Sequence, residues 1–169
     1  RFADGCMTAF DFRRQLAESN SHVQRVVRWL QASPSVFYAA DVQDDPAYFY
    51  RGDILYVPNS AVQHIEMKIE TRASSDTPNL AIERYSDEAR SKMGGPWSTR
   101  AEWYAHLYAD GLMVMMRRAT LVQWLTPNLT TFPSFSARNA TWMTTGLLVP
   151  RTMAQQALAE GYREFRISA

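Results

Sequence analysis

Two acidic residues and one lysine occupy neighbouring apolar-rich segments near the middle of the chain. Asp53 lies in the run 52–58, and Glu66 and Lys68 lie in the run 62–70. Paired carboxylates favour a hard, oxygen-preferring cation such as Mg²⁺ or Mn²⁺, which cancels their repulsion and can hold phosphate oxygens and water. A nearby lysine can orient that water or offset charge that develops on the phosphate. These residue types therefore indicate phosphodiester chemistry.

A β-hairpin is the element that would bring the three residues together. Pro58 and the residues 59–61 form a turn signal between the two apolar runs, so we expect antiparallel strands. Because side chains alternate along a strand, Glu66 and Lys68 share one face and the apolar residues between them share the other. Asp53 lies opposite the Glu66 end if the register allows it.

The order of these residues resembles a known nuclease signature. Asp53 followed by Glu66-Met67-Lys68 resembles the PD-(D/E)XK motif in the form Gly-Asp…Glu-X-Lys. The later runs Thr-Pro-Asn-Leu-Ala-Ile-Glu (77–83) and Ser-Thr-Arg-Ala-Glu-Trp-Tyr (98–104) resemble a phage-type, resolvase-like branch of that superfamily. The resemblance covers about residues 36 to 125.

The resemblance implies an α/β fold with a restriction-endonuclease-like αβββαβ core, in which helices flank a mixed central sheet. It implies a DNA-hydrolysing enzyme in which Asp53, Glu66 and the backbone carbonyl of Met67 bind Mg²⁺ or Mn²⁺. Lys68 would orient the attacking water. The residues expected to contact substrate are Arg72, Asn79, Glu83, Arg84, Lys92, Thr99, Arg100 and Tyr104. For Glu83 a surface salt bridge is the competing interpretation.

An acidic residue of the first helix, which often faces the metal in this superfamily, has no clear counterpart here. Glu18 precedes the strongest helical stretch, and His22 or Gln24 stands where the acid is expected. Two interpretations stay open: Glu18 supplies the role, or the position is not acidic and metal affinity is weaker. His22 is interpreted as a partly exposed histidine rather than as a ligand.

Periodicity and capping residues predict the surrounding elements. Apolar residues recur at helical spacing over residues 8–31. The capping-box spacing of Ser21 and Gln24 places the start of the principal helix near Ser21. The same spacing at Thr99 and Glu102 predicts a helix to about Tyr108. The other expectations are strands at 36–40, 79–85, 112–116 and 142–149, helices at 120–125 and 151–159, a loop at 126–141 and an edge strand at 162–168.

Composition favours a single intracellular domain. The chain of 169 residues suits one domain over 1–169, with its core at about 21–125 and an extension at about 126–169. Its net charge of +1 neither demands nor excludes DNA binding. The single cysteine, Cys6, rules out an internal disulfide and agrees with the cytoplasm. No apolar run is long enough to span a membrane.

The resemblance also implies DNA as partner, branched or single-stranded, a phage origin and a homodimer, although no residue specifies an interface. Two other hypotheses stay open. One is a catalytically inactive nuclease-fold module that binds nucleic acid or a protein. The other is an unrelated α/β interaction domain in which Glu66 and Lys68 form a solvated strand face. Loss of cleavage in variants of Asp53, Glu66 or Lys68 would favour the enzyme.

Overall fold

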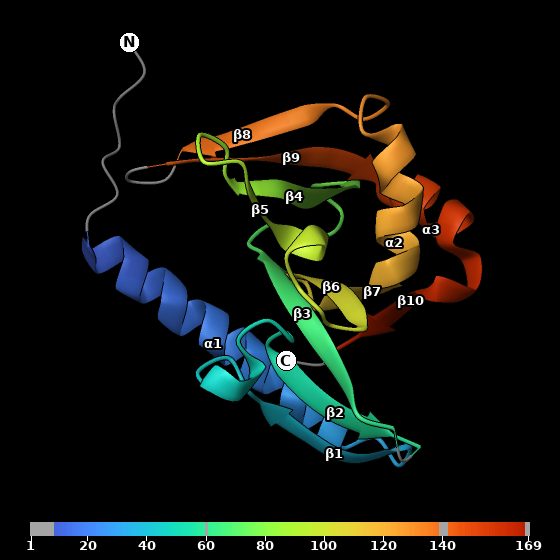
Figure 1. The fold of residues 1–169 in the computed structure, drawn as a ribbon. Coiled ribbons are helices and arrows are strands. Elements are labelled where there is room, and N and C mark those ends of the chain that lie inside the picture. The colour runs from blue at the N-terminus through green and yellow to red at the C-terminus, as the bar shows by residue number, and fades with distance from the viewer. Residues whose placement is uncertain (1–8, 60, 139–141, 168–169) are drawn as a thin grey trace.

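The computed structural model describes residues 9–59, 61–138 and 142–167, with side chains from residue 19 onward. Its fold is mixed α/β, which confirms the predicted class. One sheet has six strands in the order β1-β2-β3-β6-β7-β10, and a second has four in the order β5-β4-β9-β8. Figure 1 shows the four-stranded sheet above the curled six-stranded sheet.

The bounds of the elements are as follows. The larger sheet comprises β1 (Val36–Asp41), β2 (Ile54–Pro58), β3 (Gln63–Glu70), β6 (Trp103–Tyr108), β7 (Leu112–Arg117) and β10 (Tyr162–Arg166). The smaller comprises β4 (Asn79–Asp87), β5 (Lys92–Met93), β8 (Ser134–Arg138) and β9 (Met143–Pro150). The α-helices are α1 (Ala9–Gln31), α2 (Arg118–Leu125) and α3 (Arg151–Leu158), and the 3-10 turns are η1 (Pro46–Tyr48), η2 (Gly95–Trp97), η3 (Thr126–Asn128) and η4 (Ala159–Gly161).

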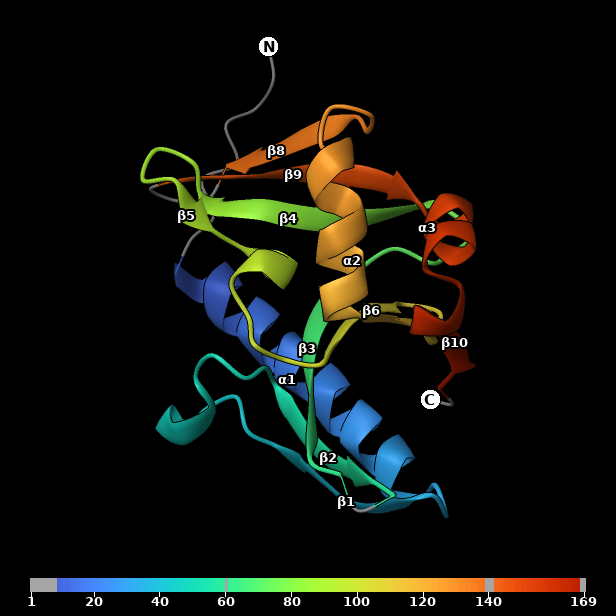
Figure 2. The ribbon, with the colours of Figure 1, turned by 45° about the vertical axis from the view of Figure 1, so that its right-hand side comes forward.

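Helix α1 covers one face of the six-stranded sheet (Figure 2). Val23, Val26, Val27 and Leu30 recur at helical spacing and are buried, so they form the stripe that packs against the sheet. Their partners include Ile65 of β3, which is fully buried in the same cluster. The apolar side of β3 therefore belongs to the core beneath α1.

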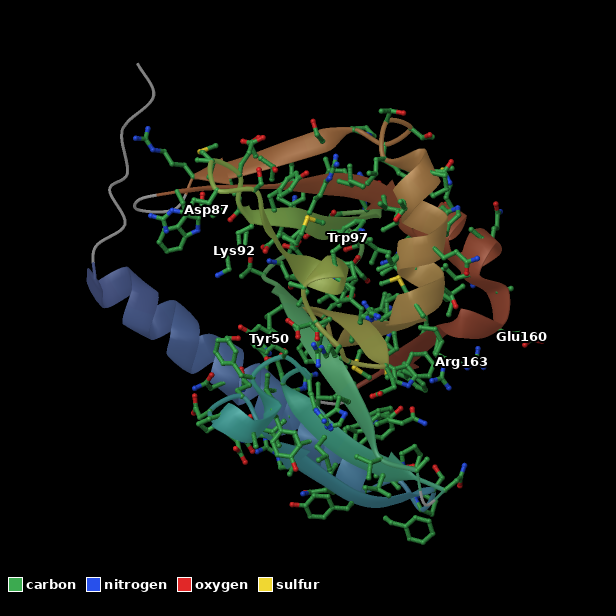
Figure 3. All side chains as sticks on the ribbon, in the orientation of Figure 1. Tyr50, Asp87, Lys92, Trp97, Glu160 and Arg163 are labelled. Atoms are coloured by element: carbon green, nitrogen blue, oxygen red, sulfur yellow. The ribbon has the colours of Figure 1, made fainter. Side chains whose placement is uncertain are left out.

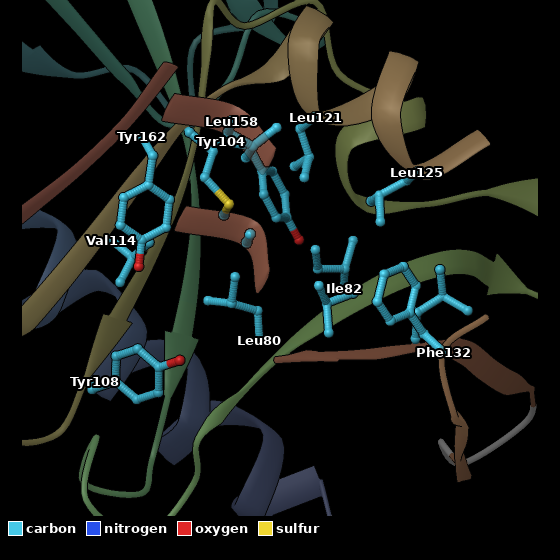
Figure 4. Packing of buried hydrophobic residues seen from close by; sticks show 14 of the residues in the cluster. Leu80, Ile82, Tyr104, Tyr108, Val114, Leu121, Leu125, Phe132, Leu158 and Tyr162 are labelled. Carbon is cyan, nitrogen blue, oxygen red and sulfur yellow. The ribbon is translucent and has the colours of Figure 1, made fainter. Parts of the chain in front are cut away.

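The opposite face of the sheet packs against the second sheet and against α2 and α3. This inter-sheet core joins Tyr104 and Tyr108 of β6 to Leu80 and Ile82 of β4, and Leu121 of α2 packs with them (Figure 4). The charged side of β3 faces this second layer, because alternation puts it opposite to Ile65.

The segment after β3 departs most from the sequence prediction. The helix predicted from Thr99 to Tyr108 is wrong, since Trp103–Tyr108 is strand β6, parallel to β3. Every residue of β6 is buried, so both faces of the segment pack against cores. The Thr99 hydroxyl accepts a hydrogen bond from the Ala101 amide at 3.1 Å, a local turn rather than a helix start.

Two smaller corrections concern the chain on either side. Helix α1 is continuous from Ala9 to Gln31, so the predicted start near Ser21 is wrong. The predicted loop at 126–141 contains η3 and strand β8, and its last residues, 139–141, lie outside the described residues.

Several expected elements are confirmed within about two residues. They are the β2–β3 hairpin, the strands β1, β4, β7 and β9, the helices α2 and α3, and the edge strand β10. The segment expected as an extension supplies β9 to the second sheet and β10 to the first, so both sheets depend on it. Within the described residues, no helix has the length and apolar character needed to cross a bilayer.

Gly52 permits the close approach of the chain to β3 just before Asp53. Its φ is +111°, and a Cβ built on it would lie 2.7 Å from the Ile65 carbonyl oxygen. We predict that Gly52→Ala lowers the free energy of unfolding by about 2 kcal/mol or more, because it adds left-handed strain to a backbone clash. Urea denaturation measures this loss.

Gly161→Ala is the matched control, because the nearest atoms to an added Cβ there belong to the side chains of Arg117, at 3.3 Å, and Thr120, at 3.8 Å, and the backbone has no positive φ. We expect a change below about 1 kcal/mol. Equal losses in the two variants would contradict a special role for Gly52.

Candidate active site

The β2–β3 hairpin brings Asp53 and Glu66 together. The paired register ends where Ile54 pairs with Ile65, and Asp53 immediately precedes Ile54. The Asp53 amide donates to the Ile65 carbonyl at 2.9 Å, which holds Asp53 against β3, and the charge of Asp53 acts on Glu66. The Met67 amide donates to Oδ2 of Asp53 at 2.7 Å. The Asp53 carboxylate is therefore fixed against the backbone of β3 beside Glu66.

Lys68 lies on the same side of β3 as Glu66, above buried residues of β6. The parallel register pairs Glu66 with Tyr104 and Lys68 with His106. Both partners are almost completely buried, with 2% of Tyr104 and 1% of His106 exposed. Glu66 itself is half-buried. The acidic face of β3 is consequently not a freely solvated strand face.

Glu83 reaches this place from the other sheet. Its Oε2 lies 3.9 Å from Nζ of Lys68, and its side chain is 20% exposed while that of Lys68 is 42% exposed. The backbone of Gly94 lies against the Glu83 side chain, so closely that an added Cβ would collide with the carboxylate. The predicted proximity of Glu83 is found, although β4 belongs to a different sheet from the hairpin.

Burial raises the pKa values of both hairpin carboxylates, and neighbouring negative charges raise them further. The pKa of Asp53 rises to about 6, mainly through desolvation and partly through Asp41, against the lowering effect of the Met67 amide. The pKa of Glu66 rises to about 7, mainly through desolvation and then through Asp53; a Thr99 hydrogen bond, which lowers it, only partly offsets these effects. Negative charge is therefore disfavoured here unless a proton or cation accompanies it.

The donor set fits a divalent cation that retains much of its water. Among the described residues, no group of three or more His, Cys, Asp and Glu side chains is arranged to hold a metal. Mg²⁺ is commonly bound through one or two carboxylates together with water and substrate phosphate, so Asp53 and Glu66 suffice for this kind of site. Raised pKa values mark the charge that such a cation would neutralise.

His106 is a buried neutral group next to Lys68. Its pKa falls to about 3 because of desolvation and, second, because of the Lys68 charge. No hydrogen-bond partner for its Nε2 atom is found in the described part of the chain. A neutral imidazole adds no positive charge beneath the lysine.

The basic residues expected to meet substrate are placed at the surface but serve different contacts. Nε of Arg72 pairs with Glu70 at 3.1 Å, and the Arg84 guanidinium lies 5.0 Å from the Tyr85 ring centroid. Lys92 is exposed on β5, and Figure 3 shows it on the same side of the molecule as Tyr50. Arg100 is exposed, and its amide donates to the Tyr50 carbonyl at 2.6 Å.

Three other expected contact residues are built into the structure. Tyr104 is buried in the inter-sheet core, so the expectation that its ring contacts substrate is wrong. Thr99 is buried and hydrogen-bonds Glu66, which makes it a support for the carboxylate. The Asn79 carbonyl accepts from the Tyr108 hydroxyl at 3.3 Å.

The first-helix acid cannot be assigned, since the Glu18 side chain lies outside the described residues. His22 is half-buried on α1. Sequence reasoning missed Asp41, whose charge acts on Asp53 from the end of β1. The β1–β2 register pairs Asp41 with Ile54, which explains this proximity. Recognising β1 and β2 as an antiparallel pair could have indicated it.

The raised carboxylate pKa values predict a sign for the pH dependence of stability. In metal-free buffer, the folded state binds these protons more tightly than the unfolded chain, so the free energy of unfolding falls as pH rises from about 4 to 7. Glu66→Gln removes the part of this loss that Glu66 causes and should stabilise the protein by about 2 kcal/mol at pH 8. Urea denaturation between about pH 4 and 8 measures both effects.

Glu70→Gln is the control for that experiment. Arg72 holds the pKa of Glu70 below its usual range despite an opposing desolvation effect. Removal of this charge should give no gain in stability at pH 8. A Glu66→Gln variant that is no more stable than the parent would contradict the strained pair.

Comparisons with protein-family models, with curated proteins and with solved structures found no match.

Proposed function

We propose that the protein is a divalent-metal-dependent deoxyribonuclease of the PD-(D/E)XK type. The observation that supports this most is the proximity of Asp53 and Glu66 at the open end of a hairpin, with Lys68 on the same strand face as Glu66. Both carboxylates have raised pKa values, as expected of acids placed together for a cation.

The chain order around the hairpin supports a restriction-endonuclease-like core. Helix α1 packs on the antiparallel strands β1, β2 and β3, and β6 then lies parallel to β3. The crossover from β3 to β6 passes through β4, β5 and η2, where the proposed core has a helix. The second sheet would then be an insertion that also delivers Glu83 to the site.

The Met67 carbonyl is suitably directed to act as a third oxygen ligand. The Met67 amide points away from β6, toward Asp53, because it donates to the Asp53 carboxylate. In a strand the N–H and C=O of one residue point to the same side. The Met67 carbonyl therefore also faces the edge at which β2 has ended, beside both carboxylates.

Hydrolysis joins a water oxygen to phosphorus and breaks the bond from phosphorus to the leaving sugar oxygen. The water gives up a proton, and the leaving oxygen gains one. A bound Mg²⁺ would neutralise charge on the phosphate and lower the pKa of coordinated water. Asp53 and Glu66 would hold this cation. Lys68 would orient the water by hydrogen bonding, and Glu83, 3.9 Å from its Nζ, would limit the positions that the ammonium occupies.

DNA with unpaired nucleotides is the substrate that the surroundings favour. Phe49 and Tyr50 directly precede the hairpin, and they are 74% and 63% exposed. Their rings pack edge to face with centroids 4.9 Å apart. The backbone amide of Arg100 donates to the Tyr50 carbonyl, and Arg100 is an exposed, positively charged residue. Exposed aromatic rings stack on unpaired bases, and nearby cations attract the phosphates.

An inactive nuclease-fold module is the second candidate. One observation favours it: His22 or Gln24 stands on α1 where an acid facing the metal is expected. Such a module would bind single-stranded or branched DNA without cutting it in Mg²⁺ or Mn²⁺.

Cleavage assays on plasmid, single-stranded and branched DNA test the proposal. We predict that Asp53→Asn, Glu66→Gln and Lys68→Met each reduce the cleavage rate by about 100-fold or more, because each removes a group that acts in the transition state. Circular dichroism and thermal melting confirm that the variants fold.

Glu70→Gln is a matched control on the same face of β3, two residues beyond Lys68, where Glu70 pairs with Arg72. It should retain cleavage within about threefold of the parent. Full activity in any of the three site variants would reject the assignment of roles. Binding without cleavage by the parent protein would select the inactive module.

A further inference from the structure

A cavity lies on the face of the six-stranded sheet opposite to the carboxylates of Asp53 and Glu66. Its volume is about 290 Å³, and α1, β2, β6, β7 and β10 contribute to its lining. Trp103 lines it from β6, whereas the next residue, Tyr104, belongs to the inter-sheet core. Figure 3 shows Glu160 and Arg163, two lining residues, far from Tyr50 and Lys92. The cavity is therefore separate from the candidate active site.

Aromatic rings form much of its wall, and hydrogen bonds fix two of them. The Tyr56 hydroxyl and the Trp103 indole both donate to Oε1 of Gln63, at 2.9 and 2.7 Å. Trp29 and Phe165 pack at a centroid distance of 5.0 Å and complete the aromatic lining. Such rings are already ordered before a ligand arrives, which lowers the entropic cost of binding.

Two arginines add positive charge to this wall. The Arg117 guanidinium lies over the Trp103 ring, 4.2 Å from its centroid. Nη1 of Arg163 donates to the Tyr162 carbonyl at 2.8 Å, which restrains that side chain. Within the described ranges neither arginine forms an ion pair, and Glu160 is the one acidic residue in the lining. The lining thus carries an excess positive charge that no described carboxylate pairs directly.

We propose that this cavity binds a small planar aromatic anion with either one ring or two fused rings. The rings would pack among Trp29, Trp103 and Phe165, while the anionic group would meet Arg117 and Arg163. Small-molecule sites combine an apolar, aromatic lining with a few polar groups that fix orientation, and their volumes begin at about 300 Å³. Guanidinium groups pair with carboxylates and phosphates and also stack on aromatic rings. The site requires no nuclease activity.

Naphthalene-2-carboxylate is a suitable probe, and naphthalene-2-carboxamide is its uncharged counterpart. We expect saturable shifts of the Trp29 and Trp103 indole N–H signals in ¹H–¹⁵N spectra of the full chain. The carboxylate should bind about tenfold more tightly than the carboxamide, because it forms charge-assisted hydrogen bonds with arginine. The proposal would be overturned if neither indole signal showed a saturable shift, or if the two probes bound with equal affinity.

Arg117→Met and Arg163→Met keep an unbranched stem and remove the charge. Each should weaken binding of the carboxylate several-fold and leave carboxamide binding unchanged. Arg90→Met is the matched control, since Arg90 is exposed and pairs with Asp87 elsewhere on the surface. If one cavity variant fails to fold, the other decides the outcome. Unchanged carboxylate affinity in a folded cavity variant, or an equal loss in Arg90→Met, would contradict the proposed contacts.

Discussion

Repulsion between two carboxylates in a partly desolvated position is the constraint on which the account of this molecule depends. The hairpin brings Asp53 close to Glu66, and the Asp53 charge adds to the desolvation that raises the energy of charging Glu66. Thr99 and the Met67 amide stabilise the charged forms by hydrogen bonding, yet both pKa values remain raised. Folded structures retain such strain at functional sites more readily than elsewhere. A cation between the carboxylates would relieve it.

The two-layer architecture explains how that strain persists. The apolar side of β3 is anchored beneath α1 through Ile65, so the strand cannot turn its acidic face outward. The second sheet and η2 then cover part of this face, which removes water from Glu66 and brings Glu83 near Lys68. Gly94 and Gly95, which have no Cβ, allow the start of η2 to approach Glu83. Packing on one face thus sets the electrostatics on the other.

Local patterns predicted the hairpin and its contents well, because alternation and turn residues act over a few positions. The continuous apolar run of β7 likewise predicted a buried strand. The segment 103–108 was not, because the capping-box spacing of Thr99 and Glu102 suggests a helix while pairing with β3 and β7 imposes a strand. Long-range contacts also decide that Tyr104 is buried and that Glu83 comes from a separate sheet. The spacing of residues along the chain does not predict contacts between distant segments.

Crystals grown with Mn²⁺ at about pH 8, in which anomalous scattering locates the metal, show directly whether Asp53 and Glu66 hold a cation. We predict a peak between the carboxylates of Asp53 and Glu66, within coordinating distance of the Met67 carbonyl. A structure at saturating Mn²⁺ with no peak there would contradict the proposed metal site. A structure in which Asp53 and Glu66 share a proton across a direct hydrogen bond would contradict it too.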